Sequence, residues 1–393
     1  MENNSYDGYI RRKMKKQRTG TVLLCALLVI IFSAITFVAA YLIFFRPSVS
    51  PTPPFINNGT TGTDEAGQVI VDTSGPYARK SGYYTFLIAG LDDASLNTDV
   101  MMLASLDTEN HKINILQIPR DTFVNKYVGG YSYVNSVNAM YSSAYHSYKV
   151  PAQGSVSDEA HKSIAKTARL EAMRDVCSRL EKSLCVKIDR FILLDTAAFR
   201  EIIDSVGGVE FDVPFDMDYD DPAQNLHIHL KAGKQILDGA KAEQFIRFRK
   251  GEKYSYPAGD IDRVDARADF MRAALSQVKS NVGFSLISQI IKTVSNDLDT
   301  DIKIEEAIYF AKEAYKVPDG NITIKTIGGT VLQNPVTGVW KYYCLNRDAA
   351  IFDINKYMNA FTRQIDAEIF DTAGFFTNAS DAEYSYINDY YNS

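Results

Sequence analysis

The sequence predicts an α/β fold: a central mixed β-sheet flanked by helices on both faces, in three layers, preceded by one transmembrane helix. Short apolar runs that end in turn residues alternate with longer segments in which apolar residues recur about every four positions. Continuous apolar runs are typical of strands that are buried on both faces. Strands of this kind, separated by helices, favour a sheet that is covered on both sides.

The anchor is predicted from residues 19–45, which carry no charge and are long enough to cross a hydrocarbon core of about 30 Å as a helix. Six basic residues lie between Arg11 and Arg18, just before this segment. Because basic flanks stay on the cytoplasmic side, we expect a single-pass protein of the cell membrane, with the cytoplasmic tail 1–18 inside and the rest outside. A cleaved signal peptide is the alternative, although its apolar core usually has only about 7–15 residues.

Three further regions follow the anchor. Proline, glycine, threonine and asparagine dominate residues 46–80, which predicts a semi-extended linker. The folded extracytoplasmic domain is expected over residues 81–365. The polar, tyrosine-rich residues 366–393 show no periodicity and are expected to form a frayed C-terminal tail, with a sugar-contacting surface as the alternative.

The first half of the folded domain contains most of the predicted strands. Apolar runs that end in turn residues predict strands at 84–90, 100–107, 112–119, 191–195 and 209–214. Apolar residues at every fourth position predict a helix within 157–184. A second helix, 197–206, follows a capping threonine, Thr196, and ends at Gly207 and Gly208.

The second half is predicted to be mainly helical, with closing strands. Helices are expected at 238–248, 262–282, 285–294, 304–315 and 349–360, and strands at 322–327 and 339–344. The apolar faces of residues 160–182 and 196–206 could line a cleft for a lipid tail, but such stripes more often pack in an ordinary core.

Composition excludes several classes of function. The net charge is −6, and the six basic residues of the cytoplasmic tail do not belong to the outer part, which is therefore more acidic than the total and is not a nucleic-acid binder by charge. Cys177 and Cys185 flank the end of a predicted helix and are either bridged or two packed thiols. No cysteine or histidine pair has zinc-like spacing and the chain has only five histidines, so a structural zinc is not expected.

Arginines and aspartates follow several of the predicted strands. Asp92 and Asp93 come after the first strand, Asp99 opens the second, and Arg120 and Asp121 follow the third. Further along, the set continues with Arg247, Arg249, Asp260, Asp262, Arg263 and Arg267.

A lone aspartate at a strand end is usually a turn or cap residue, and an arginine pair is usually a solvated face. The combination indicates more, because an α/β sheet tends to gather these chain ends at one edge, where such folds bind ligands. Arginine forks match phosphate oxygens, and carboxylates with phosphates suit Mg²⁺. The set therefore favours a pyrophosphate–metal site.

Four segments resemble the LytR-CpsA-Psr family, in the family's order. They are NTDVMMLASLDTENHKINILQIPRDTFV, GGVEFDVPFDMDY, LKAGKQILDGAKAEQFIRFRKG and GDIDRVDARADFMRAAL. The resemblance covers roughly residues 83–358. It implies an extracytoplasmic phosphotransferase of Gram-positive and related bacteria. Such an enzyme moves a glycopolymer, such as teichoic acid or capsule, from polyprenyl pyrophosphate to peptidoglycan on the outer face of the membrane.

The resemblance also implies roles for single residues. Arg120, Arg247, Arg249 and Arg263 would bind the pyrophosphate. Asp99 would hold Mg²⁺ or Mn²⁺, with Asp92 helping. Asp260 would lie beside the phosphates as a metal ligand or base, and Asp121 would orient Arg120. We therefore take Asp99, Arg120, Asp121 and Asp260 as the catalytic candidates.

The chain departs from the family pattern at two basic positions and in two loops. Asn97 stands where the family has an arginine, and Tyr133 stands where it has a lysine. The loop between Asp92 and Asp99 is short, and the loop between Arg249 and Asp260 is long. Two alternative functions therefore stay open: a wall-anchored protein that binds polyprenyl-linked glycan without turnover, and a hydrolase that cleaves the pyrophosphate.

Overall fold

The computed structural model divides the chain into two compact units, residues 1–48 and 49–393. The residues it describes are 45–49, 61–63, 69–71, 78–92, 96–124, 136–222, 226–249, 251, 254, 256, 260–281, 287, 290–291, 298–333, 341–367 and 370. The predicted cytoplasmic tail and all of the predicted transmembrane helix except Phe45 lie outside this set. Among the helices that are described, none combines the length and hydrophobicity that crossing a membrane requires.

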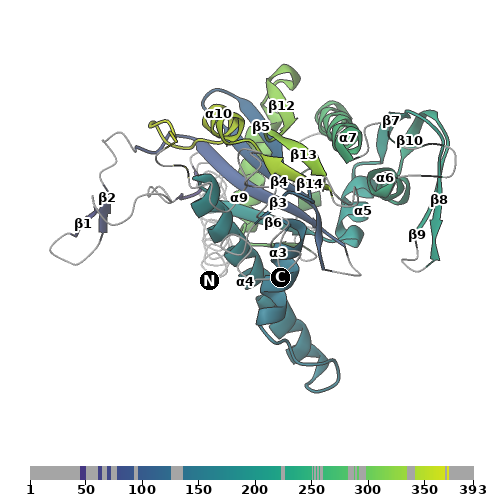
Figure 1. Cartoon of the computed structure of the whole chain (residues 1–393), viewed down its shortest axis with the longest axis horizontal. Coiled ribbons are helices and arrows are strands. Elements are labelled where there is room, and N and C mark those ends of the chain that lie inside the picture. The colour runs from purple at the N-terminus through teal and green to yellow at the C-terminus, as the bar shows by residue number, and fades with distance from the viewer. Residues whose placement is uncertain are drawn as a thin grey trace, which may run out of the picture. The chain divides into compact units, whose positions relative to one another are not determined.

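A six-stranded mixed sheet forms the centre of the larger unit, in the order β11-β6-β3-β4-β5-β12 (Figure 1). Strand β3 pairs antiparallel with β4 and parallel with β6, and β5 pairs antiparallel with β4 and parallel with β12. The bounds are β3 (Tyr83–Leu91), β4 (Thr98–Asp107), β5 (Lys112–Gln117), β6 (Arg190–Leu194), β11 (Asp299–Thr300) and β12 (Ile322–Thr326). The predicted mixed central sheet is confirmed.

One face of the sheet packs against three helices. They are α3 (Asn138–Ser147), α4 (Asp158–Leu184) and α10 (Arg347–Tyr357). Alternate residues of β3, Leu87 and Ala89, are fully buried and share one core with residues of all three helices. The apolar stripe of α4 lies in this core, so the ordinary packing expected for such a stripe accounts for it.

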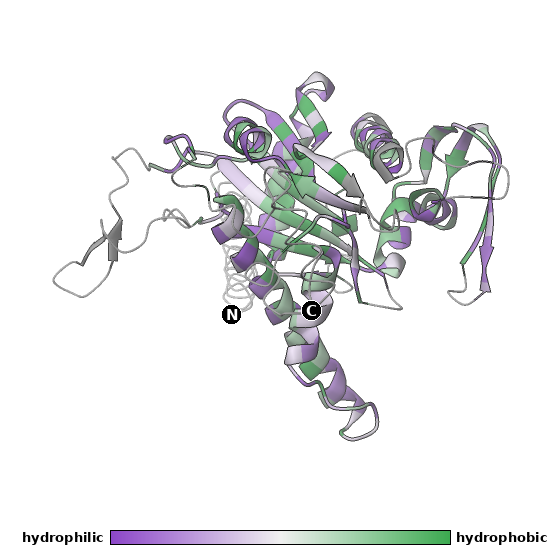
Figure 2. Cartoon of the chain, in the orientation of Figure 1, coloured by the Kyte–Doolittle hydropathy of each residue, from purple (hydrophilic) through white to green (hydrophobic). Residues whose placement is uncertain are grey.

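The other face of the sheet packs against α9 (Ile304–Tyr315). The rings of Tyr84 and Phe86, which point away from Leu87, both lie edge-on to the ring of Phe310, at centroid distances of 5.0 and 4.9 Å. Hydrophobic residues are concentrated on the central strands between these helices (Figure 2). Helices therefore cover both faces, as predicted.

A second hydrophobic core forms between residues 196 and 281. It is built from two antiparallel strand pairs, β7–β10 and β8–β9, with three helices beside them. The bounds are α5 (Thr196–Ser205), β7 (Val209–Val213), β8 (Met217–Asp221), β9 (Leu226–Leu230), β10 (Gly233–Leu237), α6 (Gly239–Arg247) and α7 (Asp260–Asn281). Phe211, Phe245 and Phe270 meet ring to ring at its centre, which joins β7, α6 and α7.

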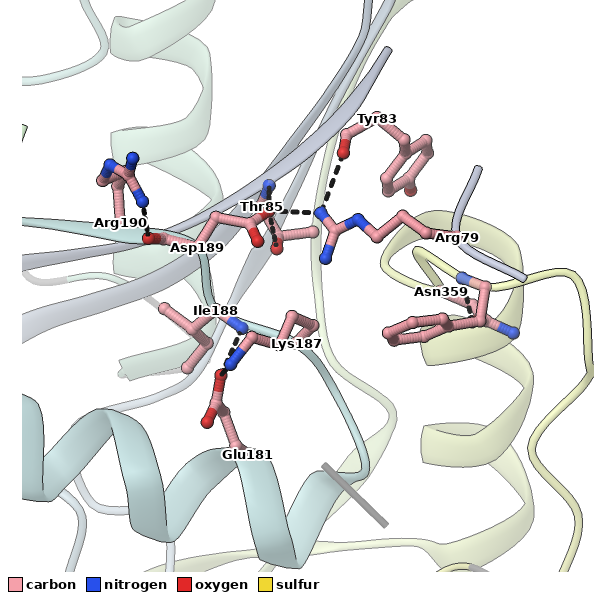
Figure 3. A network of polar contacts seen from close by, with 10 residues as sticks. Arg79, Tyr83, Thr85, Glu181, Lys187, Ile188, Asp189, Arg190 and Asn359 are labelled. Atoms are coloured by element: carbon pink, nitrogen blue, oxygen red, sulfur yellow. Dashed lines mark hydrogen bonds and ion pairs between the residues drawn. The ribbon is translucent and has the colours of Figure 1, made fainter. Parts of the chain in front are cut away.

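A buried carboxylate joins the start of the folded domain to the sheet (Figure 3). Asp189, just before β6, accepts hydrogen bonds from the backbone and hydroxyl of Thr85 and an ion pair from Arg79. The side chains of Arg79 and Asp189 are only 7% and 1% exposed. The backbone of residues 78–80 is bonded in turn to Ala360 and Thr362, beyond α10.

The remaining elements are short. Strands β13 (Gly329–Gln333) and β14 (Lys341–Leu345) form an antiparallel pair, and η2 (Asp319–Asn321) is a 3₁₀ turn. Strands β1 (Thr61–Thr63) and β2 (Val69–Val71) pair within the region predicted as linker. Phe370, five residues past the predicted end of the domain, is buried in the main core. Of the predicted helix 285–294, only residues 287, 290 and 291 are described, and all three are helical.

Cys177 and Cys185 are separate buried thiols. Of the two possibilities that the sequence left open, two packed thiols are confirmed and the disulfide is not formed. Burial raises the pKa of the Cys177 thiol above its ordinary value, with a smaller contribution from the charge of Glu181. Cys185 adopts a left-handed backbone conformation where α4 ends, so it closes the helix and packs in the core.

Candidate active site

A tight turn after β5 fixes the backbone around Arg120. The amide and hydroxyl of Thr122 both donate to the carbonyl of Pro119, at 2.9 and 2.6 Å. The amide of Asn138, at the start of α3, donates to the carbonyl of Arg120 itself. The turn is thus closed on itself and bonded to a helix, which gives Arg120 a fixed position.

Strand β14 holds the other side of the turn. The amide of Tyr343 donates to the carbonyl of Asp121, and the amide of Phe123 donates to the carbonyl of Tyr343. The phenol of Tyr343 donates to the carbonyl of Ile327, and burial raises its pKa. The sequence predicted a strand here but assigned Tyr343 no part in the site.

The side chain of Arg120 lies between two carboxylates. Its Nη1 donates to Oδ1 of Asp99 at 2.7 Å, and its Nε lies 3.6 Å from Oδ1 of Asp121. The Arg120 side chain is 17% exposed, whereas those of Asp99 and Asp121 are 35% and 36% exposed. Together, the guanidinium and the two partly exposed carboxylates carry a net charge of −1.

Arg267 of α7 connects this cluster to the end of α6. Its Nε and Nη2 donate to the carbonyl of Ile246 at 2.9 and 2.6 Å, and its Nη1 donates to the carbonyl of Asp99 at 3.4 Å. The last carbonyls of a helix have no partner within the helix, so an arginine is a suitable cap there. Arg267 was among the charged residues noted in the sequence, but no role was predicted for it. Its contact with the carbonyl of Ile246 could not be predicted from the spacing of the residues alone.

The end of α6 is positively charged. Glu243, with a side chain 13% exposed, accepts from Arg247 at 3.0 Å and pairs with Arg200 at 3.2 Å. One carboxylate therefore serves two guanidinium groups. Arg249 follows two residues after Arg247 and is exposed, with no ion pair among the described residues. Together these four side chains carry a net charge of +2.

The other predicted site residues lie around this cluster or outside the described side chains. Arg263 is 3% exposed, next to Val264, whose carbonyl accepts a hydrogen bond from the side chain of Gln117 of β5.

Asp92 closes the β3–β4 loop through backbone hydrogen bonds with Leu96 and Asn97. Asp260 is the first residue of α7, but its side chain lies outside the described set, as do residues Asp93 and Tyr133.

The carboxylates at this end of the sheet have the donor chemistry that Mg²⁺ uses, because magnesium binds one or two carboxylates together with substrate phosphates. Asp99 and Asp121 expose about a third of their side chains, so their oxygens are accessible. Among the described residues, no group of three ligating side chains includes Asp92 or Asp99. The metal pair Asp92 and Asp99 stays a prediction.

Fold and side chains define an α/β protein with arginines and aspartates gathered where β4, the turn after β5, α6 and α7 meet. The family model of LytR_cpsA_psr matches residues 57–358. The chain therefore belongs to the LytR-CpsA-Psr family, as the sequence motifs indicated.

Relatives are similar over part of their length. The chain is 26% identical over 231 residues to TagV of Bacillus subtilis, named as a polyisoprenyl-teichoic acid–peptidoglycan teichoic acid transferase, covering 57% of this chain and 51% of the relative. It is 25% identical over 276 residues to the cell wall biosynthesis protein LcpA of Corynebacterium glutamicum, covering 70% and 49%. The chain thus spans about half the length of these curated relatives.

The crystal structure of B. subtilis TagV has a similar fold. The TM-score is 0.52 at 23% identity, over 69% of this chain and 94% of that one. This likeness shows the shared three-layer architecture.

Proposed function

We propose that this chain is a phosphotransferase that moves a glycopolymer, such as teichoic acid or capsule, from polyprenyl pyrophosphate to peptidoglycan. The membership in the LytR-CpsA-Psr family and the similarity to TagV support the substrate class. The arginines and aspartates of the site support phosphoryl transfer as the chemistry. The proposed location is the outer face of the cell membrane, with residues 19–45 as the anchor.

A single contact pattern carries the proposal: one arginine joins two clusters of opposite charge. Arg267 reaches both the carbonyl of Ile246, beside Arg247, and the carbonyl of Asp99, beside Arg120. The cluster around Arg120 has a net charge of −1 and suits a divalent cation, whereas the end of α6 has a net charge of +2 and suits phosphate oxygens. A metal-bound pyrophosphate needs both kinds of partner side by side.

The proposed reaction exchanges one P–O bond for another. A sugar hydroxyl of peptidoglycan attacks the phosphorus nearer the glycan, and the bond from that phosphorus to the bridging oxygen breaks. The bridging oxygen keeps the electron pair and departs with polyprenyl phosphate, while the hydroxyl proton passes to an aspartate. Asp260 and Asp99 are the candidate bases; Asp99 already accepts from Arg120.

Fixed positive charge supplies most of the rate enhancement in this chemistry, because negative charge builds on the leaving phosphate. Arg120, Arg247, Arg249 and Arg263 are proposed to bind the phosphates. Asp99, with Asp92, would hold Mg²⁺ or Mn²⁺, which would neutralise part of the same charge. Asp121 keeps Nε of Arg120 oriented.

The anchor has a function in this scheme. The substrate is itself held in the outer leaflet by its polyprenyl tail, so attachment of the enzyme to the same membrane raises its effective concentration near that substrate.

The test compares two arginines in a transfer assay with a synthetic polyprenyl-pyrophosphate glycan and peptidoglycan fragments. Arg120→Ala should lower turnover about 100-fold or more, the size seen when one donor to a developing oxyanion is removed. Arg247→Ala should also lower it.

Arg179→Ala is the matched control. Arg179 pairs with Asp175 on α4 and is partly exposed, so its loss should leave turnover unchanged. Circular dichroism shows whether each variant is folded, and Arg120→Lys keeps the charge while removing the fork. Turnover near the wild-type value in folded Arg120→Ala and Arg247→Ala would overturn the assignment of the site.

A further inference from the structure

The β8–β9 hairpin carries four metal-ligating side chains on one exposed face. Asp218 lies directly across from His229, and Asp220 lies directly across from His227. The side chains of these four residues are 51–74% exposed. The chain has five histidines, and two of them belong to this face.

The opposite face of the hairpin fixes its position. Met217, Ile228 and Leu230 are buried in the second core, at 0%, 0% and 3% exposure. The side chains of a strand alternate between its faces, so this burial holds the aspartates and histidines on the outside. The amide of His229 also donates to Oε1 of Gln244 on α6 at 2.9 Å.

The distances within the cluster are close to those of a coordination shell. One ligand atom each from Asp220, His227 and His229 can be chosen so that all three lie within 4.8 Å of one another. Donor atoms bound at about 2.0–2.2 Å to one tetrahedral zinc lie roughly 3.3 Å apart. Oδ1 of Asp220 already lies 2.5 Å from Nδ1 of His227 and 3.4 Å from Nε2 of His229, so the three groups face one another across the strand pair.

The fourth side chain, Asp218, contacts one of the three candidate ligands, His229. Oδ1 of Asp218 lies 2.7 Å from Nδ1 of His229, while Nε2 of the same ring lies 3.4 Å from Oδ1 of Asp220. A carboxylate that accepts the Nδ1 proton leaves Nε2 as the ligand atom, which is the usual arrangement behind a metal-bound histidine. A hollow of about 270 Å³ is lined in part by Asp218, His229 and Lys231, so this side of His229 is open to water.

We propose that this face binds one Zn²⁺ through His227, His229 and Asp220, with Asp218 orienting His229. Two imidazoles favour zinc over magnesium and calcium, which prefer oxygen ligands. The bound ion joins β8 to β9 across the strand pair. Through the contact between His229 and Gln244, it also steadies α6, the helix that ends at Arg247.

Sequence spacing missed this site because its ligands are cross-strand neighbours. The histidines are two residues apart, as are the aspartates, and only the register of the hairpin brings the two pairs together. Spacing along the chain alone therefore does not predict the site.

The test measures zinc bound to the full chain after chelator treatment and dialysis against micromolar Zn²⁺ with millimolar Mg²⁺ present. The wild type should hold one zinc per chain. The double variant His227→Ala/His229→Ala should hold none, and Asp218→Asn should weaken binding about tenfold to 100-fold. His146→Ala, which removes an exposed histidine of α3, is the matched control and should keep the zinc.

X-ray absorption distinguishes this site from a cysteine site, because the proposed ligands place only nitrogen and oxygen atoms around the zinc. Zinc retained by the folded double variant, a sulfur ligand, or the absence of zinc binding by the wild type would each overturn the proposal. Asp220→Asn provides a second variant if the double variant does not fold, and it should weaken binding as well.

Discussion

Asp189 shows how one buried carboxylate can hold distant segments together. It receives Arg79 from the N-terminal segment and Thr85 from β3, and the side chain is almost completely enclosed. Burial of an ion pair is weak evidence for net stabilisation, but removal of one partner leaves the other charge buried and uncompensated.

Replacement of Asp189 by alanine should therefore lower the free energy of unfolding by about 3–5 kcal/mol. Asp175→Ala provides the comparison, because Asp175 pairs with Arg179 at the surface of α4 and its loss should cost less than about 1 kcal/mol. Denaturant unfolding of the full chain measures both. Equal costs for the two variants would contradict the structural role of Asp189.

At the scale of elements, the contact between α5 and α6 depends on a glycine. A Cβ atom at Gly239 would lie 2.4 Å from the carbonyl oxygen of Arg200. The amide of Gly239 also donates to Asp204 of α5 at 2.7 Å. The two helices approach each other closely enough that no side chain fits at this position, and α6 carries Arg247 at its other end.

The variant Gly239→Ala should push α6 away from α5 and lower the free energy of unfolding by about 1–3 kcal/mol, as overpacking usually does. Gly320→Ala is the control, because a Cβ there would meet no atom within 4 Å and the change should stay within about 0.5 kcal/mol. Thermal unfolding of both variants measures the two losses of stability. A Gly239→Ala variant as stable as Gly320→Ala would show that the close approach is not required.

Elements with strong periodicity could be predicted from the sequence. The helix expected at 304–315 has those bounds, and α4 begins one residue after the expected start. In contrast, α3 was missed because its serines, tyrosines and histidine give little apolar contrast. The hairpin β8–β9 was missed because β8 reads MDYDD, with one apolar residue buried and three aspartates.

The whole molecule contains relations that no local pattern reveals. Strand β3 lies between β4, which follows it directly, and β6, which follows a long helix, so the strand order depends on contacts far apart in sequence. The gathering of Asp99, Arg120 and Asp121 could be predicted from strand ends. The link to α6 through Arg267 could not, because it requires the second core to be placed against the sheet.

The identity of the reaction products distinguishes glycopolymer transfer from hydrolysis of the pyrophosphate and from binding alone. The full chain is incubated with a polyprenyl-pyrophosphate glycan and peptidoglycan fragments, and the products are analysed by mass spectrometry. For a phosphotransferase we expect a glycan joined to peptidoglycan by a phosphodiester, with an equal amount of polyprenyl monophosphate. Free glycan phosphate in place of the joined product would indicate a hydrolase, and bound but unaltered lipid would indicate a binding protein; either result would contradict the proposed phosphotransferase activity.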